Sequence, residues 1–258
     1  MKRFILPLAL MCVALPAAAQ YALSPLPPAT LTACESGLSQ VAQFQVLPSI
    51  AGSGDCAAID VVLLQAVILP DKVNVAVAPP ATLRCTMAEQ VARWVREDVL
   101  PATQTIAGGS LRRLDNLASY DCRTQNHIIG ARLSEHGRAN AFDVGAFRLA
   151  DGRVLTLTDV KVVKAWRDAL RATACKRFTT VLGPGSDPYH EEHVHLDLAE
   201  HRGTFRMCQW DVREPVVEAK KTEPGIEEPV PLPRPRPQMV EQAGKALSQS
   251  TKAGTQVR

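Results

Sequence analysis

Six cysteines in an exported chain constrain the fold more than any other feature of this sequence. Residues 1–19 have the parts of a secretory signal peptide: a basic start, an apolar run from Phe4 to Leu15 and small residues before Gln20. The seventh cysteine, Cys12, lies in this segment and leaves with it. An even number of cysteines in an exported protein predicts up to three disulfides. The sequence leaves their pairing open among Cys34, Cys56, Cys85, Cys122, Cys175 and Cys208.

Composition argues against three classes of protein. The formal net charge is +3, and it falls to +1 when Lys2 and Arg3 leave with the signal peptide. A nearly neutral protein lacks the basic surplus typical of nucleic-acid binders, so no nucleic-acid partner is expected. No second long apolar run follows the signal peptide, so no permanent membrane span is expected. A hydrophobic fraction of 46% is too high for a wholly disordered chain.

The chain changes character near Arg213. Residues 20–213 are long enough to form one domain with a hydrophobic core. Residues 214–258 begin with a Pro-rich stretch, which ends at Pro237, and continue as a polar segment. Such a segment cannot bury enough apolar surface to offset the entropy of ordering it, so we expect a disordered tail. The tail could act as a spacer or bind a protein partner.

Hydrophobic periodicity predicts two helices. The first begins at Thr86, which forms a capping-box pattern with Glu89, and Pro101 is expected to end it. The second runs from about residue 158 to residue 175. The tryptophan on each apolar face is expected to belong to the hydrophobic core.

Short runs rich in β-branched and apolar residues predict strands. They cover residues 61–67, 73–77, 111–118, 140–149, 177–182 and 192–198. Strands and helices do not alternate regularly along the chain, which favours an α+β fold over a doubly wound α/β fold. We therefore predict a small, mainly antiparallel sheet that carries the functional site, is flanked by helices and is braced by disulfides.

All six histidines lie between residues 127 and 201, and the first functional motif is found there. His136 and Asp143 are seven positions apart, which is unsuited to one face of a helix or strand. The spacing suits a turn that brings two ends of a loop together. Imidazole and carboxylate groups are both good zinc ligands, so the pair predicts part of a metal site. Small residues between them, such as Gly137 and Ala141, would let the backbone pass close to the metal.

The second motif alternates apolar and polar residues between positions 193 and 198. In a strand, alternate residues share a face, so His193, His195 and Asp197 would lie on one face. Two residues span roughly 7 Å along a strand, which allows one imidazole to bind a metal while its neighbour acts on a water molecule. The two motifs together supply three ligands and leave a fourth position open, which is typical of catalytic zinc sites. The predicted ligands are His136, Asp143 and His195.

These motifs resemble those of the zinc peptidases of the lysostaphin, D-Ala-D-Ala carboxypeptidase and hedgehog group. Together with Ser119–Arg123, they resemble more closely the bacterial extensin-like C-terminal domain family, over roughly residues 30–210, including the cysteine positions. The resemblance to the wider group implies that His193 assists catalysis. It also implies the same zinc ligands, namely His136, Asp143 and His195.

The resemblance leaves the general base open. Penicillin-insensitive murein endopeptidases use a His five positions before the last ligand, which is His190 here. D-Ala-D-Ala dipeptidases use a Glu three positions before it, which is Glu192 here. An Arg ahead of the first motif polarises the scissile carbonyl in the dipeptidases, and Arg123 is the candidate. The chain departs from the dipeptidases at Ala139, where they carry Gly.

Neighbouring polar residues carry weaker signals. Asp197 could orient a ligand ring, because a ligating His usually donates its other N–H to an acceptor. Ser134 could do the same. His127 and His201 are expected to be polar surface residues.

The function that follows is an exported, zinc-dependent peptidase that hydrolyses peptide bonds in the stems or cross-links of peptidoglycan. The sequence does not choose between endopeptidase and carboxypeptidase activity. The signal peptide and the family resemblance imply a periplasmic or secreted protein. One alternative is a non-catalytic zinc-containing module of the same fold that binds cell wall or a protein. Another is a purely structural zinc site, which would have its fourth position closed.

Overall fold

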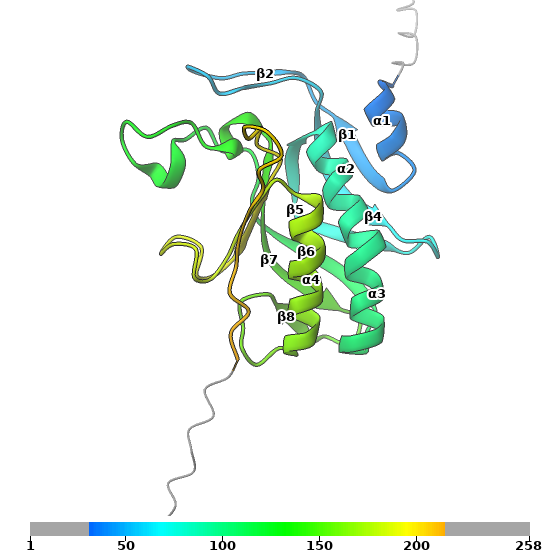
Figure 1. Cartoon of the computed structure of the whole chain (residues 1–258). Coiled ribbons are helices and arrows are strands. Elements are labelled where there is room, and N and C mark those ends of the chain that lie inside the picture. Colours follow the sequence, from blue (N-terminus) through cyan, green and yellow to red (C-terminus); the bar gives the residue numbers. More distant parts are fainter. Residues whose placement is uncertain (1–30, 215–258) are drawn as a thin grey trace, which may run out of the picture. The chain divides into compact units, whose positions relative to one another are not determined.

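One nine-stranded sheet dominates the part of the chain described by the computed structural model, residues 31–214 (Figure 1). The predicted signal peptide lies outside the described residues, as does the predicted tail beyond residue 214. The strands of this sheet are β1 (Ala42–Val46), β4 (Val61–Ile68), β5 (Asn74–Arg84), β6 (Leu111–Ala118), β7 (Ala141–Leu149), β8 (Val154–Thr156), β9 (Thr180–Leu182), β10 (Val194–Asp197) and β11 (Met207–Gln209). A separate small sheet pairs β2 (Ile50–Ala51) with β3 (Ala57–Ala58).

The strand order is β1-β4-β5-β6-β7-β10-β9-β11, and β8 pairs with β7. Only the pairs β5–β6 and β9–β11 of this sheet are parallel. The prediction of an α+β fold with a mainly antiparallel sheet is therefore confirmed. The sheet is larger than the sequence indicated, because no strand was predicted at the positions of β1, β8 and β11.

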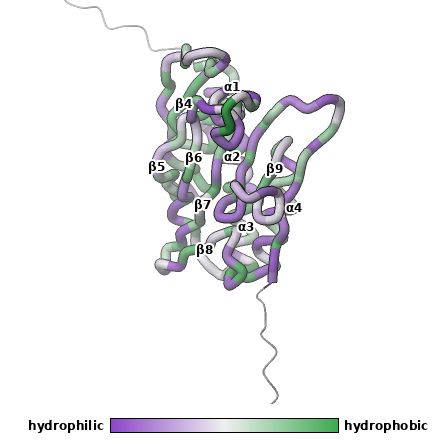
Figure 2. The backbone as a smooth tube through the Cα atoms, turned by 90° about the vertical axis from the view of Figure 1, so that its left-hand side faces the viewer, coloured by the Kyte–Doolittle hydropathy of each residue, from purple (hydrophilic) through white to green (hydrophobic). Residues whose placement is uncertain are grey.

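Two long helical segments cover one face of this sheet. The helices are α1 (Ala33–Leu38), α2 (Cys85–Trp94), α3 (Leu100–Ala102) and α4 (Lys164–Arg177). The π-helical turn η1 (Val95–Val99) joins α2 to α3, and a second one, η2 (Thr103–Ala107), extends the segment beyond α3. Figure 1 shows α2, α3 and α4 beside one another over the strands β5 to β8. The large strand–helix interface explains why the strands are so apolar, and Figure 2 shows the hydrophobic residues along β4 and β5.

The core between the sheet and the helices is built around aromatic side chains. The ring of Trp94 contacts Phe147 and Phe178 edge-on, each at a centroid distance of 5.9 Å. Trp166 contacts Phe147 from the other side at 5.8 Å. Both tryptophans are fully buried and both indole N–H groups donate to a threonine hydroxyl, as a buried indole requires. The prediction that they belong to the core is confirmed.

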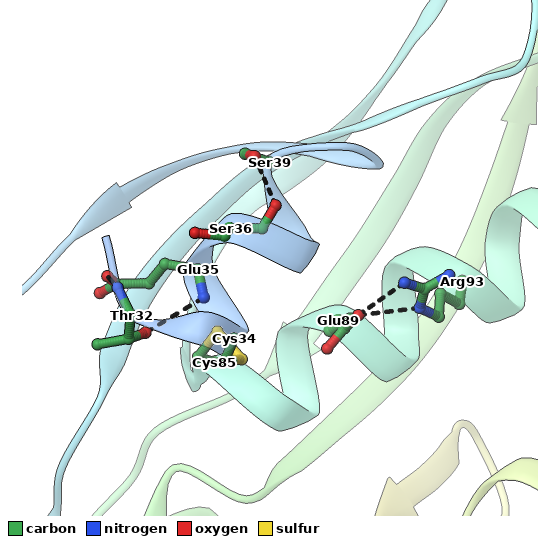
Figure 3. The surroundings of a disulfide bond; sticks show 8 residues. All are labelled: Thr32, Cys34, Glu35, Ser36, Ser39, Cys85, Glu89 and Arg93. Atoms are coloured by element: carbon green, nitrogen blue, oxygen red, sulfur yellow. Dashed lines mark hydrogen bonds and ion pairs between the residues drawn. A yellow bond between two sulfur atoms is a disulfide. The ribbon is translucent and has the colours of Figure 1, made fainter. Parts of the chain in front are cut away.

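The first predicted helix differs from the structure at both ends. Thr86 is not its cap: the helix begins directly after β5, and Arg84 is the capping residue without a side-chain hydrogen bond. Glu89 instead pairs with Arg93 one turn later (Figure 3). The backbone N–H of Cys85, the first free N–H of the helix, donates to the Asp60 carbonyl from outside the helix.

Pro101 does not end this helix, which continues to Ala107. A proline lacks the N–H for an ordinary helical hydrogen bond, and the π-helical turns before and after α3 accommodate the defect. Thr103 donates its hydroxyl hydrogen to the Val99 carbonyl at 2.7 Å. The segment stops at Gly108, whose φ of 63° is left-handed, as is common after a helix C-terminus.

The second predicted helix begins six residues later than expected, at Lys164 rather than 158. Residues 158–163 form turns, and the Asp159 carboxylate accepts the N–H of Lys161. This local hydrogen bond competes with helix formation, which is why the apolar period alone placed the start too early. The capping box of the fold lies elsewhere, between Thr32 and Glu35 of α1 (Figure 3).

All six predicted disulfide cysteines are paired. The bonds are Cys34–Cys85, Cys56–Cys122 and Cys175–Cys208. The first fastens α1 to the start of α2 (Figure 3). Disulfides are typical of oxidising compartments, so they fit an extracellular or periplasmic protein. Within residues 31–214, no helix is long and apolar enough to cross a membrane.

We expect the Cys34–Cys85 bond to contribute about 2–4 kcal/mol to the free energy of unfolding, because it closes a long loop in the unfolded chain. The two cysteines are 51 residues apart in sequence. The double variant Cys34→Ser/Cys85→Ser should unfold at correspondingly lower denaturant concentration. Ser36→Ala is the control, since Ser36 is exposed on the same short helix. Equal midpoints for the double variant and the native chain would show that the bond is thermodynamically silent.

Candidate metal centre

A cleft of about 560 Å³ opens over β7 and β10. Residues from the segment 123–138 line one wall, and residues from 180–201 line much of the other. In Figure 1 the loops that follow β6 (green) and β9 (yellow) project to the same side of the sheet. The alternation of β10 sets which side chains face the cleft. Val194 and Leu196 pack into the core with the helices, so His195 and Asp197 turn to the opposite face.

Three side chains meet at the base of this cleft, and they are the three predicted metal ligands. His195 Nδ1 lies 3.0 Å from Asp143 Oδ1. His136 Nε2 lies 3.2 Å from the same oxygen and 3.2 Å from His195 Nδ1. All three residues are buried, and they form one possible metal-binding group.

Sheet register and one tight turn bring these ligands together. Asp143 and His195 are directly opposite in the antiparallel pair β7–β10. His136 lies in the 3₁₀ turn η4 (Glu135–Arg138), and the Ser134 hydroxyl accepts the backbone N–H of His136 at the start of this turn. The turn ends at Ala139, where φ is 53°. That left-handed conformation is one that Gly adopts most readily, and Ala139 adopts it here.

Two hydrogen bonds fix which nitrogen of each ring faces the site. His136 Nδ1 donates to the Ser119 carbonyl at 2.6 Å, since a carbonyl only accepts. His195 Nε2 donates to the Asp197 carboxylate at 3.0 Å. The remaining nitrogens, His136 Nε2 and His195 Nδ1, therefore face the Asp143 carboxylate. The prediction that Asp197 orients a ligand ring agrees with this geometry.

The donor set fits a metal ion. Three electron-pair donors within 3.0–3.2 Å of one another repel unless a proton or a cation lies between them. A tetrahedral zinc site with bonds of 2.0–2.1 Å has ligand atoms about 3.3 Å apart, close to these separations. Two imidazoles and one carboxylate suit zinc and also other divalent transition metals. The structure therefore offers a His-Asp-His site without naming its metal.

The electrostatics of the three ligands favour a positive charge between them. Burial raises the pKa of Asp143, but hydrogen bonds from His136 and His195 outweigh it and hold this pKa well below its ordinary range. Burial lowers the pKa of His195, but its hydrogen bonds to Asp143 and Asp197 raise that pKa to about 9. Without a metal, a proton on His195 supplies the charge that a cation would supply.

Two more imidazoles lie beside the ligands, both from the loop before β10. His193 Nε2 is 3.5 Å from Asp143 Oδ2, and burial is the main cause that lowers the pKa of His193, which keeps the ring neutral. His190 is buried, with its ring centroid 5.2 Å from that of His193. Its Nδ1 donates to Asp187 at 2.8 Å, which leaves Nε2 free. The sequence reasoning missed Asp187, although an Asp three residues before a motif His was visible.

The other two candidates differ in position. Arg123 lines the cleft and has a partly buried side chain, paired with Asp121 at 2.9 Å. The disulfide at the adjacent Cys122 anchors it to the β2–β3 sheet. Glu192 is exposed and does not line the cleft. Of the two predicted alternatives for the general base, the structure places only His190 in the cleft.

The packing around Gly137 also restricts the size of a side chain at this position. A Cβ at this position would lie 2.7 Å from the Leu133 side chain and 3.3 Å from Cys56 Sγ. Packing under the turn therefore favours glycine there.

Comparison with known protein families gives one match. A family model described as Extensin-like protein C-terminus matches residues 32–209, from the cap of α1 to the end of β11. The matched range contains the three ligands and all the residues of the cleft that have been named. No curated protein and no solved structure matches the chain.

Proposed function

The chain belongs to the family of extensin-like protein C-termini, and from this membership and the geometry of the cleft we propose that it is an exported zinc-dependent peptidase. Its substrates are peptide bonds in the stems or cross-links of peptidoglycan. The observation that carries the proposal is a preorganised His-Asp-His site at the base of an open cleft, with two further imidazoles beside it. A purely structural site would need the ligands alone.

His136, Asp143 and His195 would hold the zinc ion. When bound, zinc supplies a Lewis acid that polarises the scissile carbonyl and makes a water molecule acidic near neutral pH. The fixed ring orientations of His136 and His195 mean that no rearrangement is needed before the ion enters. Preorganisation of this kind is what an electrostatic catalyst requires.

His190 and His193 handle the proton in this proposal. A general base must have a free lone pair and a neutral state near pH 7. The Asp187 carboxylate holds the Nδ1–H of His190, so His190 Nε2 can accept a proton. The neutral His193 ring lies between His190 and Asp143. The pair would take the proton of the attacking water and return it to the leaving amine.

Arg123 supplies a fixed cation at the cleft wall. A guanidinium that faces the cleft can stabilise negative charge on the carbonyl oxygen as the bond breaks. Its neighbours favour this position: Cys122 ties the loop down, and Asp121 holds the guanidinium at Nε while leaving other N–H groups available.

The cleft has the size expected for a peptide ligand. Its volume of about 560 Å³ lies within the range of pockets that bind small molecules and short peptides. The choice of peptidoglycan as the substrate comes from the family resemblance. The disulfides fit an exported protein, which would meet the cell wall.

The deciding experiment is cleavage of purified peptidoglycan fragments. The protein, loaded with zinc or treated with a chelator, is incubated with cross-linked dimers and with uncross-linked stem peptides, and products are identified by mass. We expect zinc-dependent products from at least one substrate, and the substrate cleaved separates endopeptidase from carboxypeptidase activity. Tight zinc binding without any cleavage would favour the non-catalytic binding module instead.

Two variants distinguish His190 from Glu192 as the residue that assists His193. Asp187→Ala removes the partner that orients His190, and we expect kcat to fall about 10- to 100-fold, as misplacement of a catalytic group does. Glu192→Gln changes an exposed side chain outside the cleft, and we expect kcat to change by less than about threefold. The opposite ranking of the two variants would transfer the role to Glu192. Zinc content is measured for both to exclude metal loss.

A further inference from the structure

Three arginines line the cleft, and all of them come from the segment between β6 and β7. Arg123 pairs with Asp121 at 2.9 Å, and Arg138 pairs with Glu135 at 3.4 Å. The third is Arg132, whose side chain forms no ion pair and no hydrogen bond within the described part of the chain. Its positive charge is therefore left for a ligand of the cleft.

None of the other carboxylates that line the cleft pairs with Arg132 in the part of the chain that the structure describes. Asp143, Asp187 and Asp197 each lie against a histidine ring. Glu200 also lines the cleft, but it forms no ion pair with Arg132. The Arg132 side chain is exposed, so its guanidinium keeps its N–H donors available to a molecule that enters.

Backbone hydrogen bonds fix the place of Arg132 relative to the metal site. Its carbonyl accepts the N–H of Gln125 at 2.9 Å, and the N–H of Ser134 donates to the Arg123 carbonyl at 3.0 Å. These bonds close the base of the loop that follows β6 (green in Figure 1). Ser134 then accepts the backbone N–H of His136. Because a residue spans at most about 3.6 Å, the Cα atoms of Arg132 and His136 are no more than about 14 Å apart.

That span is the length of a short stretch of peptide. An extended peptide advances about 3.3 Å per residue, so about four residues cover the distance. A peptide whose scissile bond lies at the His-Asp-His group can therefore place a group beside Arg132. The planar guanidinium donates two parallel N–H bonds to a carboxylate, and the opposite charges strengthen both bonds. A free carboxylate is the peptide group that complements this side chain best.

We propose that Arg132 is a binding residue that selects peptides with a free carboxylate within about four residues of the cleaved bond. The inference rests on the proposed function for the position of that bond, but the binding step does not require catalysis. Two sources offer the same chemistry: the C-terminus of a stem peptide, and the carboxylate of an acidic residue within the stem. The experiment separates them.

The test is the binding of fluorescently labelled stem pentapeptides, measured by anisotropy. Four peptides are compared, in which the C-terminal carboxylate, the inner carboxylate, both or neither are converted to the amide. Zinc-loaded and chelator-treated protein are measured in parallel, so that binding is separated from turnover. Amidation of the recognised carboxylate should weaken binding by the native chain about 3- to 10-fold, as expected for a charged hydrogen bond at an exposed site. The amide that binds more weakly identifies the source.

Substitutions of Arg132 show whether this residue carries the preference. Arg132→Gln should abolish it and leave the affinity for the doubly amidated peptide unchanged. Arg132→Lys keeps the charge without the planar fork and should retain part of the preference. The matched control is Arg112→Gln, since Arg112 is an exposed arginine of β6 that does not line the cleft. This control should keep the native preference.

The outcomes also separate this inference from the proposed activity. No binding by the native chain, equal affinities for all four peptides, or a native preference in Arg132→Gln would overturn the role of Arg132. An equal loss in Arg112→Gln would reduce the effect to net charge and overturn it as well. Selective binding that depends on Arg132, without zinc-dependent cleavage, would support the binding role and count against the peptidase activity alone.

Discussion

Replacing His136 with alanine will abolish stable zinc binding. The variant loses one of three proposed protein ligands. Asp143 and His195 remain, but no donor atom replaces His136 Nε2. Structural zinc sites with four ligands bind with about 10–16 kcal/mol, so one ligand contributes roughly 3 kcal/mol, or more than a hundredfold in affinity. Metal content after dialysis, measured by mass spectrometry, should fall from about one zinc per chain to near zero.

The matched control for this experiment is His127→Ala. His127 also lines the cleft, but it is exposed on the loop after β6 and is not among the groups that converge on Asp143. Its removal should leave zinc content unchanged. Full zinc content in the His136→Ala protein would show that the ligand set is wrong.

Thermal unfolding measures zinc binding by the His136→Ala protein in a second way. A ligand that binds only the folded state at a free concentration of 100 times its Kd stabilises it by about 2.7 kcal/mol. Zinc should therefore raise the unfolding temperature of the native chain and of His127→Ala, but not that of His136→Ala. A similar rise in all three would mean that zinc binds elsewhere.

The three residues of the possible metal-binding group could be predicted to lie together because each depends on a short-range pattern. The alternation around His195 defines one face of a strand, and that strand forms where it was expected. Asp143 lies on a second predicted strand, so sheet pairing alone could bring the two residues opposite each other. His136 needed only a turn before that strand. The overall α+β class followed from the same local signals.

The remaining features depend on tertiary contacts that a pattern does not contain. The pairing of six cysteines is decided by which loops meet in the fold. The choice between His190 and Glu192 could not be read from alternation, because β10 begins only at Val194 and both residues precede it. The direction of the His190 ring is set instead by a local hydrogen bond in the loop, from His190 Nδ1 to the Asp187 carboxylate.

The second large effect, a loss of cleavage, is expected when His190 or His193 is replaced. His193→Ala and His190→Ala should each bind zinc within about threefold of the native affinity, because neither ring belongs to the His-Asp-His group. Cleavage should fall about 10²- to 10⁴-fold in each, which is the usual contribution of a general acid or base. Separating metal affinity from turnover in this way is what distinguishes a proton-transfer residue from a ligand.

The double variant then tests whether the two rings act together. Residues that serve one step are strongly non-additive, so His190→Ala/His193→Ala should lose little more activity than the worse single variant. Independent roles would instead multiply the two losses. If a zinc-loaded single variant cleaves at the native rate, the replaced ring has no part in the mechanism. Native turnover of the double variant would refute the proposed proton path altogether. Because His190 lies between Asp187 and His193, the larger single loss identifies which ring faces the attacking water.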